Sequence, residues 1–182
     1  MDVKQAIFLS ARYILLLLLG FPGLFLIYLL ATPLTIYFSL FVLKLLLGSQ
    51  VYLYGTSRIV LDGGFIDIIP ACVAGAAYYF LLILNLSTPM KAKTRIKSLI
   101  FIIGLFYVLN VIRITLFSTL AFSGLSESFF DIAHKATWYF GSTFLVVLIW
   151  FANVRLFGIK NVPIYTDFKN IYAAAFGRKR NQ

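Results

Sequence analysis

The chain has 182 residues, of which 62% are apolar and only 12% are charged, and its formal net charge is +10. Soluble domains usually carry about 25% charged residues, so this composition excludes an ordinary soluble domain and indicates that lipid solvates many of the apolar side chains. The basic residues lie between and after the apolar runs, which favours anionic lipid headgroups over nucleic acid as their partners. The length suits one domain, and we predict a single transmembrane domain over 1–182.

The first apolar run extends from about Tyr13 to Leu30, with a possible start at Ala6. Its length is sufficient to cross a bilayer. It contains no small-x-small cleavage site, and apolar sequence resumes directly after Phe21-Pro22-Gly23. We therefore predict a retained membrane span rather than a cleaved secretory signal.

A shorter apolar segment over 34–47 follows Thr32-Pro33 and contains Lys44. A segment of this length is compatible with a short span, a re-entrant helix or an interfacial helix. We predict a membrane-embedded helix. The choice also decides the side of the N-terminus, because Met1 lies outside if 34–47 spans the bilayer and inside if it does not.

The pattern changes between 48 and 71, where residues that favour β-strands mix with polar ones. Asp62-Gly63-Gly64 is a turn signal between two such stretches. We predict a small extracellular β-hairpin over 48–71, lying on the membrane surface.

Three further apolar runs are predicted spans: Cys72 to Leu86, Leu99 to Ala121, and about Lys135 to Val154. The loop over 87–98 carries four basic residues and no acid, and the tail over 155–182 carries six basic residues and one acid. Both segments are therefore predicted to be cytoplasmic. The segments 48–71 and 122–134 then lie outside, and they hold four of the six acidic residues of the chain.

The predicted fold is an all-α polytopic membrane protein. It is a bundle of about five membrane helices, four of full length and one short, with the small extracellular hairpin at one end. The predicted location is the cell (plasma) membrane, with the C-terminus in the cytoplasm.

Polar residues inside the apolar runs are costly and therefore point to function. Arg113 lies eight residues before Ala121, which places it about 12 Å from the outer end of its helix. Asn110 precedes it by three residues and shares its helix face. Both side chains are expected to point into the bundle.

The only cysteine and the only histidine fall near the same outer side. Cys72 begins a predicted helix, and a helix N-terminus and a nearby arginine both favour the thiolate form. His134 stands at the outer edge of the last span, with Asp131 one turn earlier. An imidazole in such a position can exchange protons near neutral pH.

A cysteine and a histidine are the two groups that a thiol acyl-transferase requires. Cys72 would attack a carbonyl, His134 would protonate the leaving amine and activate the acceptor, and Arg113 would stabilise the thiolate or oxyanion. Structural roles stay open: Cys72 can simply pack, His134 can sit at the headgroups, and Asn110 can bond between helices. Arg113 can form an ion pair with Asp131 or Asp67.

The order of these residues resembles the exosortase/archaeosortase family of membrane cysteine transpeptidases. The matching segments are Pro70-Ala71-Cys72-Val73-Ala74-Gly75, Leu109-Asn110-Val111-Ile112-Arg113-Ile114 and Ile132-Ala133-His134-Lys135. The resemblance covers roughly residues 34–152. The family often has Ser or Thr with Gly directly after the cysteine, whereas Val73 and Ala74 precede Gly75 here. The short chain is more similar to the compact archaeal branch.

The resemblance implies that the chain processes surface proteins. Family members recognise a C-terminal sorting signal made of a short motif, a transmembrane helix and a basic cluster. They cut near the motif and pass the new C-terminus to a membrane lipid or another acceptor. By position, Cys72 would be the nucleophile, His134 the proton carrier and Arg113 the charge stabiliser, with Asn110 and Asp131 in support.

A different class of function also fits the polar residues. A non-catalytic assembly factor or a small-solute transporter would use Arg113 and Asn110 to bind an anionic solute or a partner helix. One histidine and one cysteine do not form a metal site, and the sequence contains no phosphate-binding glycine loop. No metal or cofactor is therefore predicted in either case.

Overall fold

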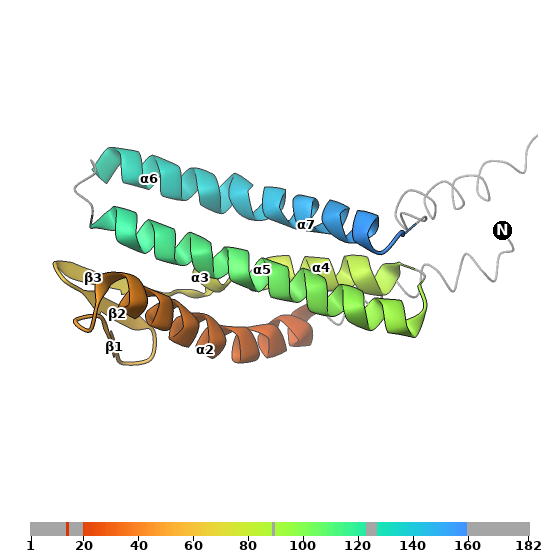
Figure 1. Ribbon diagram of the computed structural model, residues 1–182, viewed down its shortest axis with the longest axis horizontal. Coiled ribbons are helices and arrows are strands. Elements are labelled where there is room, and N and C mark those ends of the chain that lie inside the picture. The colour runs from red at the N-terminus through yellow and green to blue at the C-terminus, as the bar shows by residue number, and fades with distance from the viewer. Residues whose placement is uncertain (1–13, 15–19, 89, 123–126, 160–182) are drawn as a thin grey trace, which may run out of the picture.

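The computed structural model describes residues 14, 20–88, 90–122 and 127–159 of the chain. This part is mostly helical, with a small three-stranded sheet at one end of a helix bundle (Figure 1). Within these described residues, three helices are long and apolar enough to cross a membrane: Pro22–Leu47, Pro70–Ser87 and Ala92–Ala121. Most of the predicted cytoplasmic tail, and the beginning of the first predicted span, lie outside the described residues.

The first described helix, α2, runs without interruption over Gly20–Leu47. The prediction of a separate short helix over 34–47 is therefore wrong. Pro33 lies inside α2 and removes one backbone N–H, but the exposed ring at this position does not end the helix. In apolar surroundings the flanking backbone groups keep their helical bonds, so a proline is tolerated there. The hydroxyl of Tyr107 also donates to the Leu34 carbonyl at 2.9 Å, one residue beyond the proline.

The predicted hairpin is a three-stranded antiparallel sheet in the order β1-β2-β3. The strands are β1 (Tyr52–Tyr54), β2 (Arg58–Leu61) and β3 (Gly64–Asp67). The turn between β2 and β3 falls at Asp62 and Gly63, as the sequence predicts, and Gly63 takes a φ of 92° that favours glycine. The extra strand β1 was not predicted, because three residues give too short a pattern.

Two helices, α3 (Pro70–Val73) and α4 (Gly75–Ser87), lead away from the sheet, and α5 (Ala92–Ala121) returns to it. The predicted basic loop over 87–98 is wrong in its bounds, because α5 begins at Ala92. Lys93 and Arg95 lie on the first turns of α5, where long basic side chains can extend past the apolar part of a helix. Arg95 donates to the Thr88 carbonyl at 2.8 Å and so holds the α4–α5 turn.

The last helical segment contains α6 (Glu127–Ala136), a π-helical turn η1 (Thr137–Gly141) and α7 (Ser142–Leu156). The last span is predicted to begin at about Lys135, whereas the chain is already helical from Glu127. The polar positions of α6 explain this difference, since they lie on one face of a helix and an apolar-run criterion does not detect them. Asp131 and Lys135 form an exposed ion pair one turn apart at 2.7 Å.

Close contact between α2 and α4 depends on small residues. A Cβ atom added at Gly75 would lie 2.6 Å from the Tyr28 ring, and one added at Gly20 would lie 2.8 Å from the Tyr79 hydroxyl. Small residues allow helices to approach in this way. On the other side of α4, the ring of Tyr78 meets Phe106 of α5 edge-on, with 4.7 Å between the centroids.

A buried polar chain joins α4, α5 and α7 at the end of the bundle away from the sheet. The Asn85 side-chain amide donates to the Ser98 hydroxyl at 2.5 Å, and this hydroxyl donates to the Asn153 side-chain carbonyl at 2.8 Å. All three side chains are completely buried. Hydrogen bonds between apolar helices help to fix their register.

We expect Ser98→Ala to lower the free energy of unfolding by about 1–2 kcal/mol, because it leaves the buried amides of Asn85 and Asn153 without the hydroxyl between them. Thermal unfolding of the purified chain in detergent measures this change. Thr119→Ala is the matched control on α5, because that hydroxyl is exposed and bonds only locally to Leu116. Equal melting temperatures for the two variants would contradict the role of Ser98.

Candidate active site

A cavity of about 560 Å³ lies at the sheet end of the bundle, between β3, α3, α5 and α6. Cys72, Arg113, His134 and Asp131 all line it. Their elements are far apart in the sequence and converge beside the sheet (Figure 1). Pockets for small ligands usually measure about 300–1,000 Å³, so this cavity has the size of a binding site.

Cys72 is positioned by the short helix α3. Pro70 occupies the first turn of α3, where its missing N–H costs nothing and its fixed φ favours the helix. The backbone N–H of Cys72 donates to the Ile69 carbonyl at 2.9 Å. The side chain is a free thiol and is half-buried, so it is in contact with the protein and still borders the cavity.

The helix that carries Cys72 breaks two residues later. Ala74 adopts a left-handed conformation with φ 58° and ψ 43°. After this break the N–H of Ala77 bonds the Ala74 carbonyl rather than that of Val73. Carbonyls at the end of α3 therefore need partners from outside their own helix.

Asn110 of α5 supplies one of these partners. Its side-chain amide donates to the Cys72 carbonyl at 3.0 Å and to the Val73 carbonyl at 3.4 Å. The side chain is 1% exposed. Asn110 therefore joins α5 to the break directly beside the candidate nucleophile.

Arg113 supplies a second partner from the next turn of α5. Its guanidinium donates to the Cys72 carbonyl at 3.2 Å. An arginine has five N–H donors, so one bond to a carbonyl leaves donors for the cavity that the side chain lines. The Asn110-x-x-Arg113 spacing thus places two donors on one carbonyl of the helix that bears Cys72.

We expect Ala74→Gly to be tolerated or to stabilise the fold by up to about 1 kcal/mol, because glycine adopts φ near +60° without the steric cost that alanine has. Ala74→Val is expected to destabilise by about 1–2 kcal/mol for the opposite reason. Melting temperatures in detergent test the pair. A lower stability for glycine than for valine would show that the left-handed conformation at this residue is not retained.

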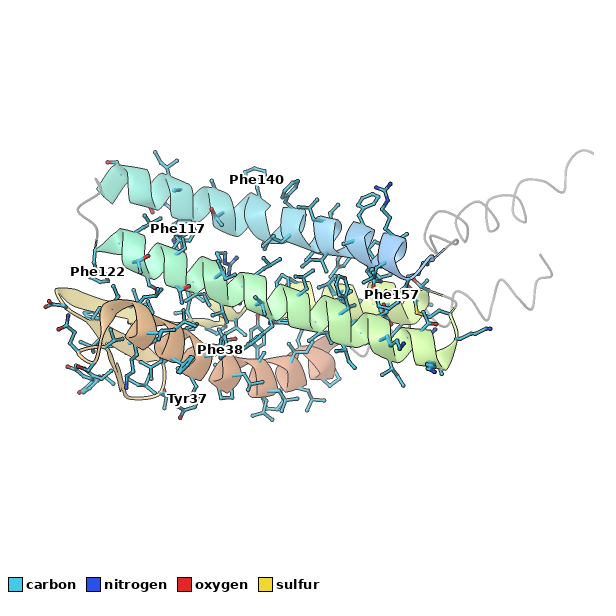
Figure 2. The ribbon with its side chains drawn as sticks, viewed as in Figure 1. Tyr37, Phe38, Phe117, Phe122, Phe140 and Phe157 are labelled. Carbon is cyan, nitrogen blue, oxygen red and sulfur yellow. The ribbon has the colours of Figure 1, made fainter. Side chains whose placement is uncertain are left out.

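His134 lies on the last turn of α6 and is exposed beside the cavity. Its imidazole meets the ring of Phe117 at 5.5 Å between centroids, tilted by 62°. Figure 2 shows Phe117 between α5 and α6. The π-helical turn begins three residues later, at Thr137, and such turns often accompany functional sites. The imidazole on α6 thus contacts α5 through the Phe117 ring.

The two carboxylates that line the cavity, those of Asp67 and Asp131, form ion pairs with cations other than Arg113. Asp67 accepts from the Arg58 guanidinium at 2.7 and 2.8 Å, and Asp131 pairs with Lys135. Among the described residues, neither predicted ion pair of Arg113 is formed. The hydrogen bonds from Arg58 also lower the pKa of Asp67, so this residue is an unsuitable proton donor near neutral pH.

Several lining residues were not predicted from the sequence. The strand β3 and the two residues after it contribute a continuous stretch, Phe65–Ile69, and α5 adds Ser118. The extended stretch before the cysteine was visible in the sequence. Its place against the cavity depends on how the sheet packs, which no local pattern reveals.

The arrangement combines a thiol, an imidazole and a guanidinium in one cavity. Such a set can perform nucleophilic acyl chemistry, in which the imidazole moves protons and fixed donors stabilise negative charge. Within the described residues, no three His, Cys, Asp or Glu side chains are grouped so as to hold a metal ion. Comparison with protein-family models, with curated proteins and with solved structures found no match to this chain.

Proposed function

We propose that the chain is a membrane-embedded cysteine transpeptidase or protease that processes C-terminal sorting signals of secreted surface proteins. The observation that carries this proposal is the single cavity that Cys72, Arg113 and His134 share. The resemblance of the three sequence segments to the exosortase/archaeosortase family supplies the substrate class. The substrate would be a short motif followed by a transmembrane helix and a basic cluster.

The proposed topology has four crossings, made by α2, by α3 with α4, by α5, and by α6 with η1 and α7. Basic side chains gather at the end away from the sheet, on the α4–α5 turn, the start of α5 and the end of α7. Under the positive-inside rule this end is cytoplasmic, and the sheet and cavity face outside. Because α2 is one continuous helix, it counts as one crossing and the total is even. The beginning of α2 therefore lies on the same, cytoplasmic side as the end of α7.

In the proposed mechanism the Cys72 thiolate attacks the carbonyl carbon of the scissile peptide bond. Arg113 stabilises the negative charge that develops. The carbon–nitrogen bond breaks, the leaving amine takes a proton from His134, and a thioester on Cys72 remains. An acceptor hydroxyl, amine or water then gives its proton to His134 and attacks the thioester, which releases the Cys72 sulfur.

The thioester offers a direct test. The probe is a secreted reporter with a randomised segment of about six residues before an apolar helix and a Lys/Arg cluster, co-expressed with the full chain. Members that lose a C-terminal tag are selected, and hydroxylamine is added to the membranes. We expect the processed reporter to end in a hydroxamate. If processing occurs without any hydroxamate, the acyl-enzyme mechanism is wrong.

The break between α3 and α4 favours one alternative, since interrupted helices with a nearby arginine also form solute sites in transporters. Transporter sites lie near the middle of the bilayer, whereas Arg113 lies well beyond Phe106, the midpoint of α5. A transporter or assembly factor would need Arg113 and Asn110 but not the thiol. It would therefore keep its activity in a Cys72→Ala variant.

A further inference from the structure

Among the strands that the structure describes, β3 is an edge of the sheet, because it pairs only with β2. The stretch Phe65–Ile69 lines the same cavity as Cys72, Arg113 and His134. The opposite edge strand, β1, contributes no residue to this cavity. The free edge of β3 and the candidate nucleophile therefore border the same space.

The register of the sheet shows which backbone groups of β3 face the cavity. Ile68 donates its N–H to the Ser57 carbonyl at 2.9 Å, and Ile66 stands opposite Ile59. Backbone groups of successive strand residues point to alternate sides. Phe65 and Asp67 therefore direct their N–H and C=O groups away from β2, and no described residue bonds them.

Arg58 on β2 contacts both residues of the outward edge. Arg58 binds both carboxylate oxygens of Asp67, at 2.7 and 2.8 Å. The same guanidinium lies 4.0 Å above the centroid of the Phe65 ring. One side chain thus contacts both Phe65 and Asp67, the two residues whose backbone groups point away from β2, and contacts that order an edge lower the entropic cost of binding.

We propose that β3 binds the substrate by strand addition. The peptide segment beside the scissile bond lies extended along β3, bonds to the backbone of Phe65 and Asp67, and brings its carbonyl to Cys72. This inference rests on the proposed function and adds how the substrate is held. A peptide is the favoured occupant because the edge borders the cavity that contains the reactive side chains. In strand addition the affinity comes from hydrogen bonds to the peptide backbone, which every peptide possesses.

The test uses peptide chloromethyl ketones on the full chain in detergent micelles. The thiolate of Cys72 displaces chloride and forms a thioether, so the alkylation rate reports how well each peptide is held near the thiol. The probes are acetyl-Gly chloromethyl ketone, acetyl-Val-Thr-Val-Gly chloromethyl ketone, and two isomers of the longer probe that carry one N-methyl group on the second or the third residue. Iodoacetamide measures access to the thiol itself.

We expect the longer peptide to react at least about tenfold faster than acetyl-Gly chloromethyl ketone, the gain of two added backbone hydrogen bonds. One N-methyl isomer should lose this gain and the other should keep it, because alternate amides face β3. Equal rates for the two isomers would overturn strand addition. A chain that fails to react with iodoacetamide would also overturn it, because the cavity would then be closed to ligands.

A matched pair of variants at Phe65 tests whether the faster alkylation by the longer peptide depends on the backbone N–H of β3. Both Phe65→Pro and Phe65→Ala remove the ring, but only the proline variant also removes the N–H that faces away from β2, a change that an edge strand tolerates. We expect the proline variant to lose the length-dependent gain and the alanine variant to keep it, with equal iodoacetamide rates in both. Loss in both variants would assign the effect to the ring of Phe65. These rates do not depend on processing, so they can fail while the proposed function stands.

Discussion

Cys72→Ala is expected to reduce processing of the selected reporter by at least about a thousandfold, because the proposed reaction has no other nucleophile. The fold should survive, since Cys72 is half-buried and its hydrogen bonds to Ile69, Asn110 and Arg113 use only the main-chain atoms of Cys72. Release of the C-terminal tag from the co-expressed reporter, followed by immunoblot, measures the effect. Membrane insertion is checked in the same samples by extraction resistance at high pH.

Phe80→Ala is a suitable control for this experiment. Phe80 lies on α4 with 48% of its surface exposed and does not line the cavity, so its loss should leave processing unchanged. If a membrane-inserted Cys72→Ala variant processed the reporter at the wild-type rate, the thiol mechanism would be wrong. The assembly-factor or transporter alternative would then be favoured.

Arg113→Leu is expected to lower the processing rate by about a hundredfold to a thousandfold, the usual effect of losing one donor to a developing negative charge. The charge alone does not explain the role, because the guanidinium also holds the Cys72 carbonyl. Arg113→Lys keeps a charge but presents a single ammonium in place of the planar fork, so we expect activity between those of wild type and Arg113→Leu. Initial rates of tag release, compared at equal amounts of inserted protein, measure the series.

Two variants on the same helix separate chemistry from packing. Ile112→Ala changes a neighbour that is 53% exposed and should keep normal activity. Asn110→Ala removes the other donor to the Cys72 carbonyl and should lower both activity and the melting temperature. If Arg113→Leu also lowers the melting temperature as much as Asn110→Ala and processes normally once folded, Arg113 is a structural residue.

Much of the fold could be predicted because the relevant signals are local. The apolar helices and the Asp62-Gly63 turn each depend on a few neighbouring residues, and the helix predicted to begin at Cys72 begins two residues earlier, at Pro70. Element bounds were less predictable. The apolar segments before and after Thr32-Pro33 belong to one helix, α2, because a sequence does not distinguish a tolerated proline from a helix end.

The candidate site also has some features that local sequence predicts and others that depend on tertiary contacts. The residue types and their shared end of the bundle followed from the spacing of Cys72, Arg113 and His134 relative to the apolar runs. Asn110 was predicted to support the site, and it bonds the Cys72 carbonyl. The ion pairs considered for Arg113 did not form, because Asp67 has a closer partner across the sheet and Asp131 has one a turn away on its own helix.

The sequence by itself determined the apolar, mostly helical character of the chain and the identity of its few reactive side chains, since composition and hydropathy are properties of local segments. Only the tertiary structure decided that these side chains share one cavity. It also decided that the helix carrying Cys72 breaks at Ala74, where Asn110 and Arg113 donate to the Cys72 carbonyl, and that β3 lines the same cavity as the thiol. These features depend on contacts between residues distant in the chain, and packing alone brings such residues together.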